Sequence, residues 1–161
     1  SANVELIRAM PTTSSRFNKG ITASLNISST LSTYNKAKKM FNKVGMVIEL
    51  KKEQEMDTFT GLIGSGPAYF FYLLKAYEKR LIKLCNNDSA LTAKAMSGLL
   101  EGVALSLEDG SSIDDLIKKV ASKKGTTEAG LKSFKKNKLL SSFDKGISAA
   151  VNRSKEIANE S

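Results

Sequence analysis

The amino-acid sequence predicts a mainly helical chain that begins with a small α/β segment. Apolar residues alternate with polar ones over 20–27, as in a β-strand, whereas from about residue 68 they recur at the three- and four-residue spacing of helices. Only two prolines, Pro11 and Pro67, interrupt the 161 residues. We therefore expect an α/β part over residues 1–52 and an all-helical part over residues 53–161.

The first part shows three strand-like runs and one helical run. Strands are predicted over 4–8, 20–27 and 46–50. Pro11 and the polar residues after it are expected to end the first strand. The apolar residues of 35–44 fall on one helical face, and Gly45 is expected to close that helix. Three strands are too few for a complete sheet domain, so we expect this part to be the end of a larger one.

The second part consists of helices joined by short polar or glycine-rich segments. They are predicted over 53–62, 68–84, 89–107, 112–120, 127–136 and 139–158. Three glycines within 61–66 are expected to break the first helix, and Pro67 suits the start of the next. Gly98 and Gly102 lie one turn apart and would let a partner helix approach closely. Such apolar helices are expected to pack against a second subunit as well as within the chain.

Composition excludes several kinds of chemistry. The chain has no histidine, so it has no imidazole base and no histidine-activated nucleophile. With a single cysteine, Cys85, a transition-metal site is not expected, and no disulfide can form within one chain. Cys85 stands in an apolar helical pattern and is expected to be a core residue. We expect no membrane span, no signal peptide and a cytoplasmic location.

The net charge of +9 is concentrated in one segment. Nine lysines between Lys118 and Lys145 face only two acidic residues, Glu128 and Asp144. A basic helical module that binds nucleic acid remains an alternative, although only 4 of the 25 basic residues are arginine and aromatic residues are few there. A small anionic substrate or a phosphate-bearing cofactor fits such a segment at least as well.

Residues 120–131 are predicted to be the end of one helix, a tight turn and the start of another. Gly125 is expected to permit the turn, Thr126 or Thr127 to cap the next helix, and Glu128 to lie in its first turn. Free N–H groups at a helix N-terminus form a natural anion site, which two hydroxyls and two lysines would surround here. An ordinary capped connection between helices is the alternative.

Three motifs, in this order and spacing, resemble pyrroline-5-carboxylate reductase. They are RAMPTT at residues 8–13, GSGPAY at 64–69 and VASKKGTT at 120–127. DTFT at 57–60 and AAVNRS at 149–154 add to the resemblance, which covers nearly the whole chain. It implies the last part of an N-terminal Rossmann domain over residues 1–52 and a complete helical dimerisation and substrate-binding domain over 53–161. The segment that holds the cofactor phosphates would then lie outside this chain, which alone would be inactive.

The resemblance also implies a reaction and a site. The reaction is hydride transfer from NADPH or NADH to a cyclic imine, which gives L-proline, in a homodimer that often builds larger rings. Ser122, Gly125 and Thr126 would hold the substrate carboxylate, and Thr127 would hydrogen-bond near the ring nitrogen as the catalytic residue. Met10, Pro11 and Thr12 would line the nicotinamide, and no metal is implied.

The chain departs from the family pattern at several of these positions. The family usually has Asn at Thr12, Pro at Ser14 and Pro-Gly at Lys123 and Lys124. The first change bears on the nicotinamide side and the last on the stiffness of the substrate turn. An altered substrate, a divergent reductase and a family fragment that serves only in assembly therefore remain alternatives.

Overall fold

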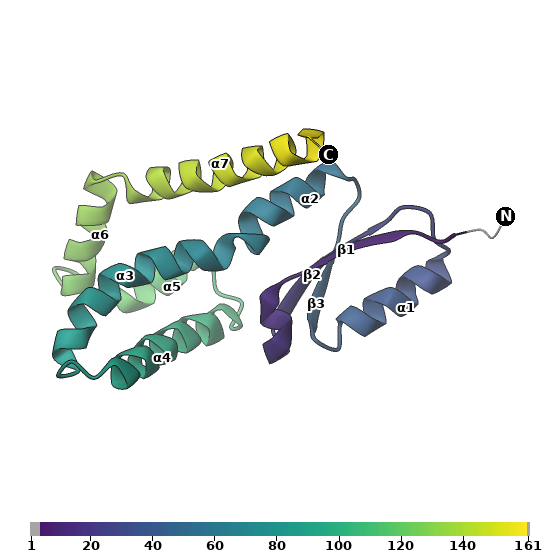
Figure 1. The fold of residues 1–161 in the computed structure, drawn as a ribbon. Helices are drawn as coiled ribbons and strands as arrows, with labels where there is room; N and C mark the ends of the chain where they lie inside the picture. The colour runs from purple at the N-terminus through teal and green to yellow at the C-terminus, as the bar shows by residue number, and fades with distance from the viewer. Residues whose placement is uncertain (1–3, 161) are drawn as a thin grey trace. The chain divides into compact units, whose positions relative to one another are not determined.

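A computed structural model describes residues 4–160, which form two packing units. The first unit comprises the chain up to Pro67 together with the residues from Lys145 onward, and the second comprises Ala68–Asp144. Figure 1 shows the elements along the chain. This division follows packing, whereas the predicted boundary at residue 53 concerns the domains of a longer protein and stays a prediction. Each unit is described by itself below.

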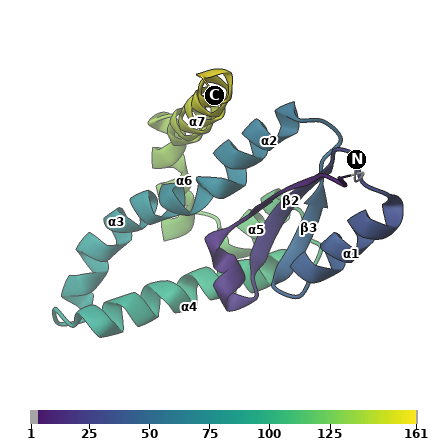
Figure 2. The same cartoon turned by 45° about the vertical axis from the view of Figure 1, so that its right-hand side comes forward.

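The first unit is built on a three-stranded sheet in the order β1-β2-β3. β1 (Ile7–Pro11) pairs antiparallel with the central strand β2 (Gly20–Asn26), and β3 (Gly45–Glu49) pairs parallel with it. The parallel pair requires a crossover, which α1 (Leu31–Phe41) provides (Figure 2). The sequence thus predicted all three strands and the helix between the second and the third.

Two boundaries in this unit differ from the prediction. The first strand lies at residues 7–11 instead of 4–8, and Pro11 belongs to it, paired with Thr22. Proline is tolerated there because β1 is an edge strand that ends at Pro11. Helix α1 begins four residues earlier than predicted, since the Thr30 hydroxyl accepts the Thr33 N–H at 3.2 Å and caps it.

The central strand is buried on both faces of the sheet. Ala23 and Leu25 form a core with Met56 and Phe59 of α2 (Gln54–Phe59). Ser24 alternates with them and faces the other way, where the Tyr34 hydroxyl of α1 donates to its carbonyl oxygen at 3.1 Å. The strand therefore carries apolar residues toward α2 and small polar residues toward α1.

The glycine-rich break predicted after residue 60 does not occur. Helix α2 continues through a π-helical turn, η2 (Thr60–Gly64), and only Ser65 bends the backbone before α3 (Gly66–Leu84) begins. Gly61 serves close packing here instead of ending the helix. A Cβ built on Gly61 would lie 2.8 Å from the Val151 backbone nitrogen and would overlap the Val151 side chain. Gly61 therefore lets the end of α7 (Leu139–Glu160) approach the π-helical turn.

A hydrogen bond fixes the same contact of α7. The Ser154 hydroxyl donates to Asp57 Oδ1 at 2.8 Å, across 97 positions of sequence. This bond and the Gly61–Val151 approach involve two of the segments that carried the family resemblance. The C-terminal helix is thereby attached to α2 and η2 within the first unit.

The second unit consists of helices with little core of their own. It contains most of α3, all of α4 (Ser89–Leu107), α5 (Ile113–Val120) and α6 (Thr126–Lys136), and the start of α7. The Asp88 carboxylate caps α4 and the Ser112 hydroxyl caps α5. Between Ala68 and Asp144 only Cys85 and Thr92 are buried. The predicted burial of Cys85 is confirmed.

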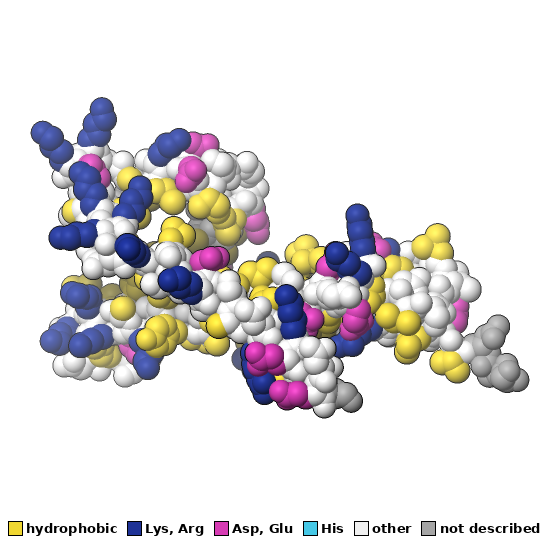
Figure 3. Space-filling view, turned by 90° about the horizontal axis from the view of Figure 1, so that it is seen from above, with side chains coloured by type: hydrophobic (Ala, Val, Ile, Leu, Met, Phe, Trp, Pro, Cys, Tyr) yellow, Lys and Arg dark blue, Asp and Glu magenta, His cyan; other side chains and the backbone are white. Residues whose placement is uncertain are grey.

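Large apolar side chains of α3 and α4 are consequently exposed in the single chain. Phe71 is 67% exposed, Tyr72 74% and Val103 54%. Figure 3 shows yellow apolar side chains at the surface between dark-blue lysines and arginines. Helix α4, with 19 residues, is also long and apolar enough to span a membrane by length and composition. A helix covered by another protein chain meets this criterion of length and composition equally.

Alanine substitutions at two glycines test the packing of α7. We expect Gly61→Ala to destabilise the chain by about 1–3 kcal/mol, because the methyl group meets backbone atoms that cannot move aside. Gly146→Ala, within α7, has open space around its Cβ and should stabilise the helix by roughly 0.5–1 kcal/mol. Urea unfolding at fixed protein concentration measures both. Equal effects of the two substitutions would contradict the close approach at Gly61.

Candidate functional site

The predicted site residues lie in different packing units. Met10, Pro11 and Thr12 belong to the first unit, and the segment of residues 122–127, here called the α5–α6 turn, belongs to the second. The two groups are therefore described separately. Each is built by a different local mechanism.

The α5–α6 turn leaves helical N–H groups open. The Gly125 N–H donates to the Ser122 carbonyl at 3.0 Å, which closes the turn. The first backbone bond of α6 runs from the Ala129 N–H to the Gly125 carbonyl at 3.2 Å. The N–H groups of Thr126 and Thr127 precede that bond and point out of the helix end. These donors and the positive end of the helix dipole are the features that attract an anion.

Two details of this turn differ from the prediction. Neither threonine caps α6; Gly125 occupies the N-cap position, without a side-chain bond. Gly125 also has ordinary extended dihedrals, φ −84° and ψ 173°, and the residue with positive φ, at 58°, is Lys124. Glycine is required at 125 for space, since a Cβ there would overlap the Ser122 hydroxyl and lie 3.0 Å from its carbonyl oxygen.

The carboxylate of Glu128 links the turn to the body of α6. One oxygen accepts the backbone N–H of Lys124, and the other lies 2.7 Å from the Lys132 ammonium. The Lys132 ammonium first, and then the Lys124 N–H, hold the pKa of Glu128 below its usual range. Sequence reasoning placed Glu128 in the first turn of the helix but missed its bond to Lys124. The spacing of four residues between the two was the only signal.

The lysine side chains of this region surround the turn without making fixed contacts to it. Lys123 and Lys124 are exposed, as are Lys135 and Lys136 in the last turn of α6. Exposed ammonium groups are mobile and hydrated, so they raise the local positive potential more than they position a ligand. The backbone N–H groups are the fixed part of the site.

Met10, Pro11 and Thr12 end the edge strand and differ in what they offer a ligand. Met10 packs against the core, and its sulfur accepts the Thr60 hydroxyl of η2 at 3.4 Å. The Thr12 hydroxyl accepts the Ile21 N–H at 2.9 Å and lies 2.8 Å from the Ser14 hydroxyl. Pro11 is exposed. The polar side chain of Thr12 is thus used within the fold, and its pair with Ser14 accounts for the two departures from the family pattern here.

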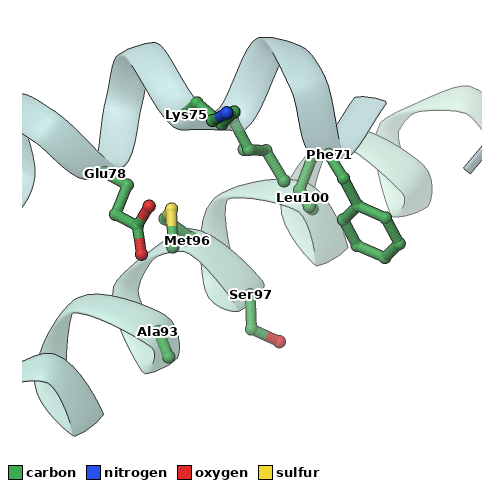
Figure 4. A pocket seen from close by; sticks show the side chains of 8 residues that line it. Phe71, Lys75, Glu78, Ala93, Met96, Ser97 and Leu100 are labelled. Atoms are coloured by element: carbon green, nitrogen blue, oxygen red, sulfur yellow. The ribbon is translucent and has the colours of Figure 1, made fainter. Parts of the chain in front are cut away.

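Two apolar hollows lie among the helices of the second unit. One, of about 390 Å³, lies between α3 and α4; Figure 4 shows Phe71 and Lys75 of α3 on one side and Met96 and Leu100 of α4 on the other. The larger, of about 660 Å³, is a groove between α4 and α5 that includes Gly102. Both linings are mostly apolar, with Lys75 and Glu78 in the first and the ion pair of Asp109 and Lys119 in the second. Both are features of helix surfaces that lack a covering partner.

Metal-binding side chains do not gather in the described part of the chain. Residues 4–160 contain no group of three or more histidine, cysteine, aspartate or glutamate residues close enough to hold an ion.

Comparison with known proteins gives one consistent result. Residues 53–157 match the family model described as pyrroline-5-carboxylate reductase dimerisation. Over 156 residues the chain is 32% identical to pyrroline-5-carboxylate reductase 1 of Bacillus spizizenii and 29% identical to the reductase of Pseudomonas aeruginosa. Both alignments include 96% of this chain, but only 52% and 57% of the respective relative.

Solved structures show the same likeness in three dimensions. The TM-score is 0.82 to a pyrroline-5-carboxylate reductase from Coxiella burnetii, at 31% identity, and 0.82 to the NADP-bound pyrroline carboxylate reductase of Plasmodium falciparum, at 25% identity. Each superposition includes 97% of this chain and 58% or 60% of the other. The chain thus spans a little over half the length of the relatives it matches.

A glycine substitution tests the strained position in the turn. A residue with a Cβ at φ 58° carries a cost of roughly 1–2 kcal/mol, which Lys124→Gly relieves. Glycine also loses more entropy on folding, so we expect a net stabilisation of about 0.5–1 kcal/mol. The control is Lys123→Gly, whose backbone is not left-handed and which should only destabilise. If thermal unfolding gave the reverse order, the turn would have another conformation.

Proposed function

Because the chain belongs to the pyrroline-5-carboxylate reductase family, we propose that it is the substrate-binding and dimer-forming part of an imino-acid oxidoreductase. The reaction is the reduction of pyrroline-5-carboxylate to L-proline, the last step of proline biosynthesis. The observation that carries the proposal is the α5–α6 turn, which directs free N–H groups outward at the N-terminus of an 11-residue helix. We further propose a cytoplasmic location for the enzyme.

The substrate carboxylate is proposed to lie against the N–H groups of Thr126 and Thr127. The helix dipole favours the negative charge, and Ser122 adds a hydroxyl beside Gly125. Since the Gly125 N–H already bonds Ser122, glycine contributes space for the Ser122 side chain rather than a donor. The Thr127 hydroxyl would then lie toward the ring, where it hydrogen-bonds near the imine nitrogen and balances its proton. The lysines 123 and 124 raise the potential without direct contact.

A surface for the nicotinamide of the cofactor is proposed at Met10, Pro11 and Thr12. When bound, NADPH or NADH supplies the hydride that reduces the C=N carbon. The exposed Pro11 offers an apolar surface to a flat ring, and Met10, held by Thr60 and the core, fixes the backbone beneath it. The Thr12 hydroxyl is already hydrogen-bonded to the Ile21 N–H and the Ser14 hydroxyl, so only backbone groups remain for polar contacts with the cofactor there. These residues therefore fit an apolar ring face and offer no binding site for phosphate.

Assembly into a homodimer is supported by the match to a dimerisation family over residues 53–157. We propose that α3, α4 and α7 pack across the two-fold axis and that dimers associate further into rings. An obligate interface buries more than about 2,000 Å² in total, and the exposed apolar side chains of α3 and α4 are the surface we propose for it. Burial of α4 in that interface also accounts for its apolar composition without a membrane.

Two substitutions in the turn test the proposed substrate site. In the longest polypeptide that the gene encodes, Thr127→Val should lower kcat/KM for pyrroline-5-carboxylate, because a hydrogen bond to a charged group is lost. The corresponding loss of transition-state stabilisation is about 1–3 kcal/mol. Lys123→Ala should cost less and mainly change the salt dependence. Steady-state oxidation of NADPH at several salt concentrations measures both. A full rate for Thr127→Val together with loss of activity in Lys123→Ala would replace the backbone site by a lysine-based one.

A bulky residue at Gly102 tests the dimer surface. A Cβ at Gly102 meets no atom within 4 Å in the single chain, so Gly102→Leu is accommodated by the monomer. In a dimer with close helix packing it should raise the dissociation constant at least tenfold. Lys94→Leu, on the same helix but on a solvated face, is the control and should leave assembly unchanged. Light scattering at micromolar concentration reports the outcome, and a monomeric parent chain would contradict the proposed dimer.

A further inference from the structure

Lys124 has a strained backbone conformation, which a contact from α6 stabilises. Its φ of 58° lies in the left-handed region, where a side chain with a Cβ is disfavoured. Asparagine, aspartate and glycine adopt this conformation readily, but lysine has no side-chain group that stabilises it locally. The next residue is Gly125, whose N–H closes the turn onto Ser122. A change in the backbone conformation of Lys124 would therefore displace the start of α6.

Glu128 supplies that contact from the first turn of α6. Its Oε2 accepts the Lys124 N–H, and its Oε1 lies 2.7 Å from the Lys132 ammonium one turn further along the helix. We call this set of contacts the Glu128 bridge. It ties the residue before the N-cap to the helix body, in the manner of a capping box displaced by one residue. Glu128 accepts the Lys124 N–H, whereas the N–H groups of Thr126 and Thr127 stay open.

We propose that Glu128 is a positioning residue of the substrate site, which acts by holding Lys124 in the left-handed conformation and so directs the Thr126 and Thr127 N–H groups at the substrate carboxylate. The inference rests on the proposed function of the turn. Glu128 does not contact the substrate; its own negative charge is offset by Lys132, so it can stand close to an anion site. Glu128 thereby stiffens the turn, which contains two consecutive lysines.

A purely structural role of Glu128 predicts a different pattern of effects. An acidic residue in the first turn stabilises any helix through the dipole, and the pair with Lys132 at i,i+4 adds a little more. Both effects are independent of which residue stands at position 124. The positioning role, in contrast, depends on the strain at Lys124, so it must weaken when that strain is removed.

The test combines Glu128→Ala with Lys124→Gly and measures L-proline affinity by NMR at the Thr126 and Thr127 amides of the chain. Glu128→Ala should weaken binding about five- to tenfold, as expected for misaligned donors. In the Lys124→Gly background the same change should cost less than about twofold, because glycine adopts the left-handed conformation unaided. Glu128→Gln, which keeps an acceptor oxygen, should restore most of the affinity.

Two controls separate the bridge from general helix stability. Lys132→Ala removes the ion pair but not the bond to Lys124, so it should weaken binding only through the uncompensated charge of Glu128, an effect that added salt removes. The Lys124 amide shift should titrate with Glu128, below the usual pKa of that carboxyl because of Lys132 and the Lys124 N–H, and should stop doing so in Glu128→Gln. Lys132 is the charged group that acts on this carboxylate.

The outcomes are distinct for the two claims. An equal loss of affinity from Glu128→Ala with lysine or glycine at 124, or no loss at all, overturns the positioning role. A Lys124 amide that ignores the titration of Glu128 does so as well. If the parent chain shows no shift with millimolar L-proline while that amide titrates, the proposed substrate site is contradicted, and the amide still establishes that Glu128 fixes the turn.

Discussion

The exposure of apolar side chains in the second unit is the constraint on which the rest of the structure depends. Between Ala68 and Asp144 only Cys85 and Thr92 are buried, whereas the first unit has a sheet packed against α1 and α2. Helices without a core are stabilised by another surface or not at all, since isolated helices are marginal in water. The turn before α6 takes its position from those same helices. Assembly and the geometry of the proposed site are therefore consequences of one need for burial.

The α5–α6 turn has a conformational requirement of its own. For its N–H groups to stay open, the turn requires a small residue at 125 and a left-handed residue before it. The left-handed residue is a lysine, which does not favour that conformation. The Glu128 bridge resolves this by using a side chain of the helix itself as the acceptor. A comparable compensation exists on the sheet edge, where Thr12 and Ser14 share a hydrogen bond. In both places a departure from the family pattern is accompanied by a new contact within the chain.

Sequence reasoning found the elements whose signals are local. Caps at Asp88 and Ser112 and the period of α4 are encoded within a few residues, and these boundaries were right. It failed where tertiary contacts decide: the helix across Gly61 continues because α7 packs there, and Pro11 stays in a strand because that strand lies at an edge. The turn does require a glycine at 125, but for space and not for a special backbone conformation. The left-handed conformation, which suits glycine, occurs at Lys124.

The most direct measurement is a crystal structure of the chain with L-proline. The expected result is a carboxylate within hydrogen-bond distance, about 2.7–3.2 Å, of the Thr126 and Thr127 backbone nitrogens, with Glu128 still bound to the Lys124 N–H. A carboxylate held by lysine ammonium groups away from the start of α6, or a ligand bound elsewhere while the turn keeps its geometry, would contradict the claim that backbone donors form the substrate site.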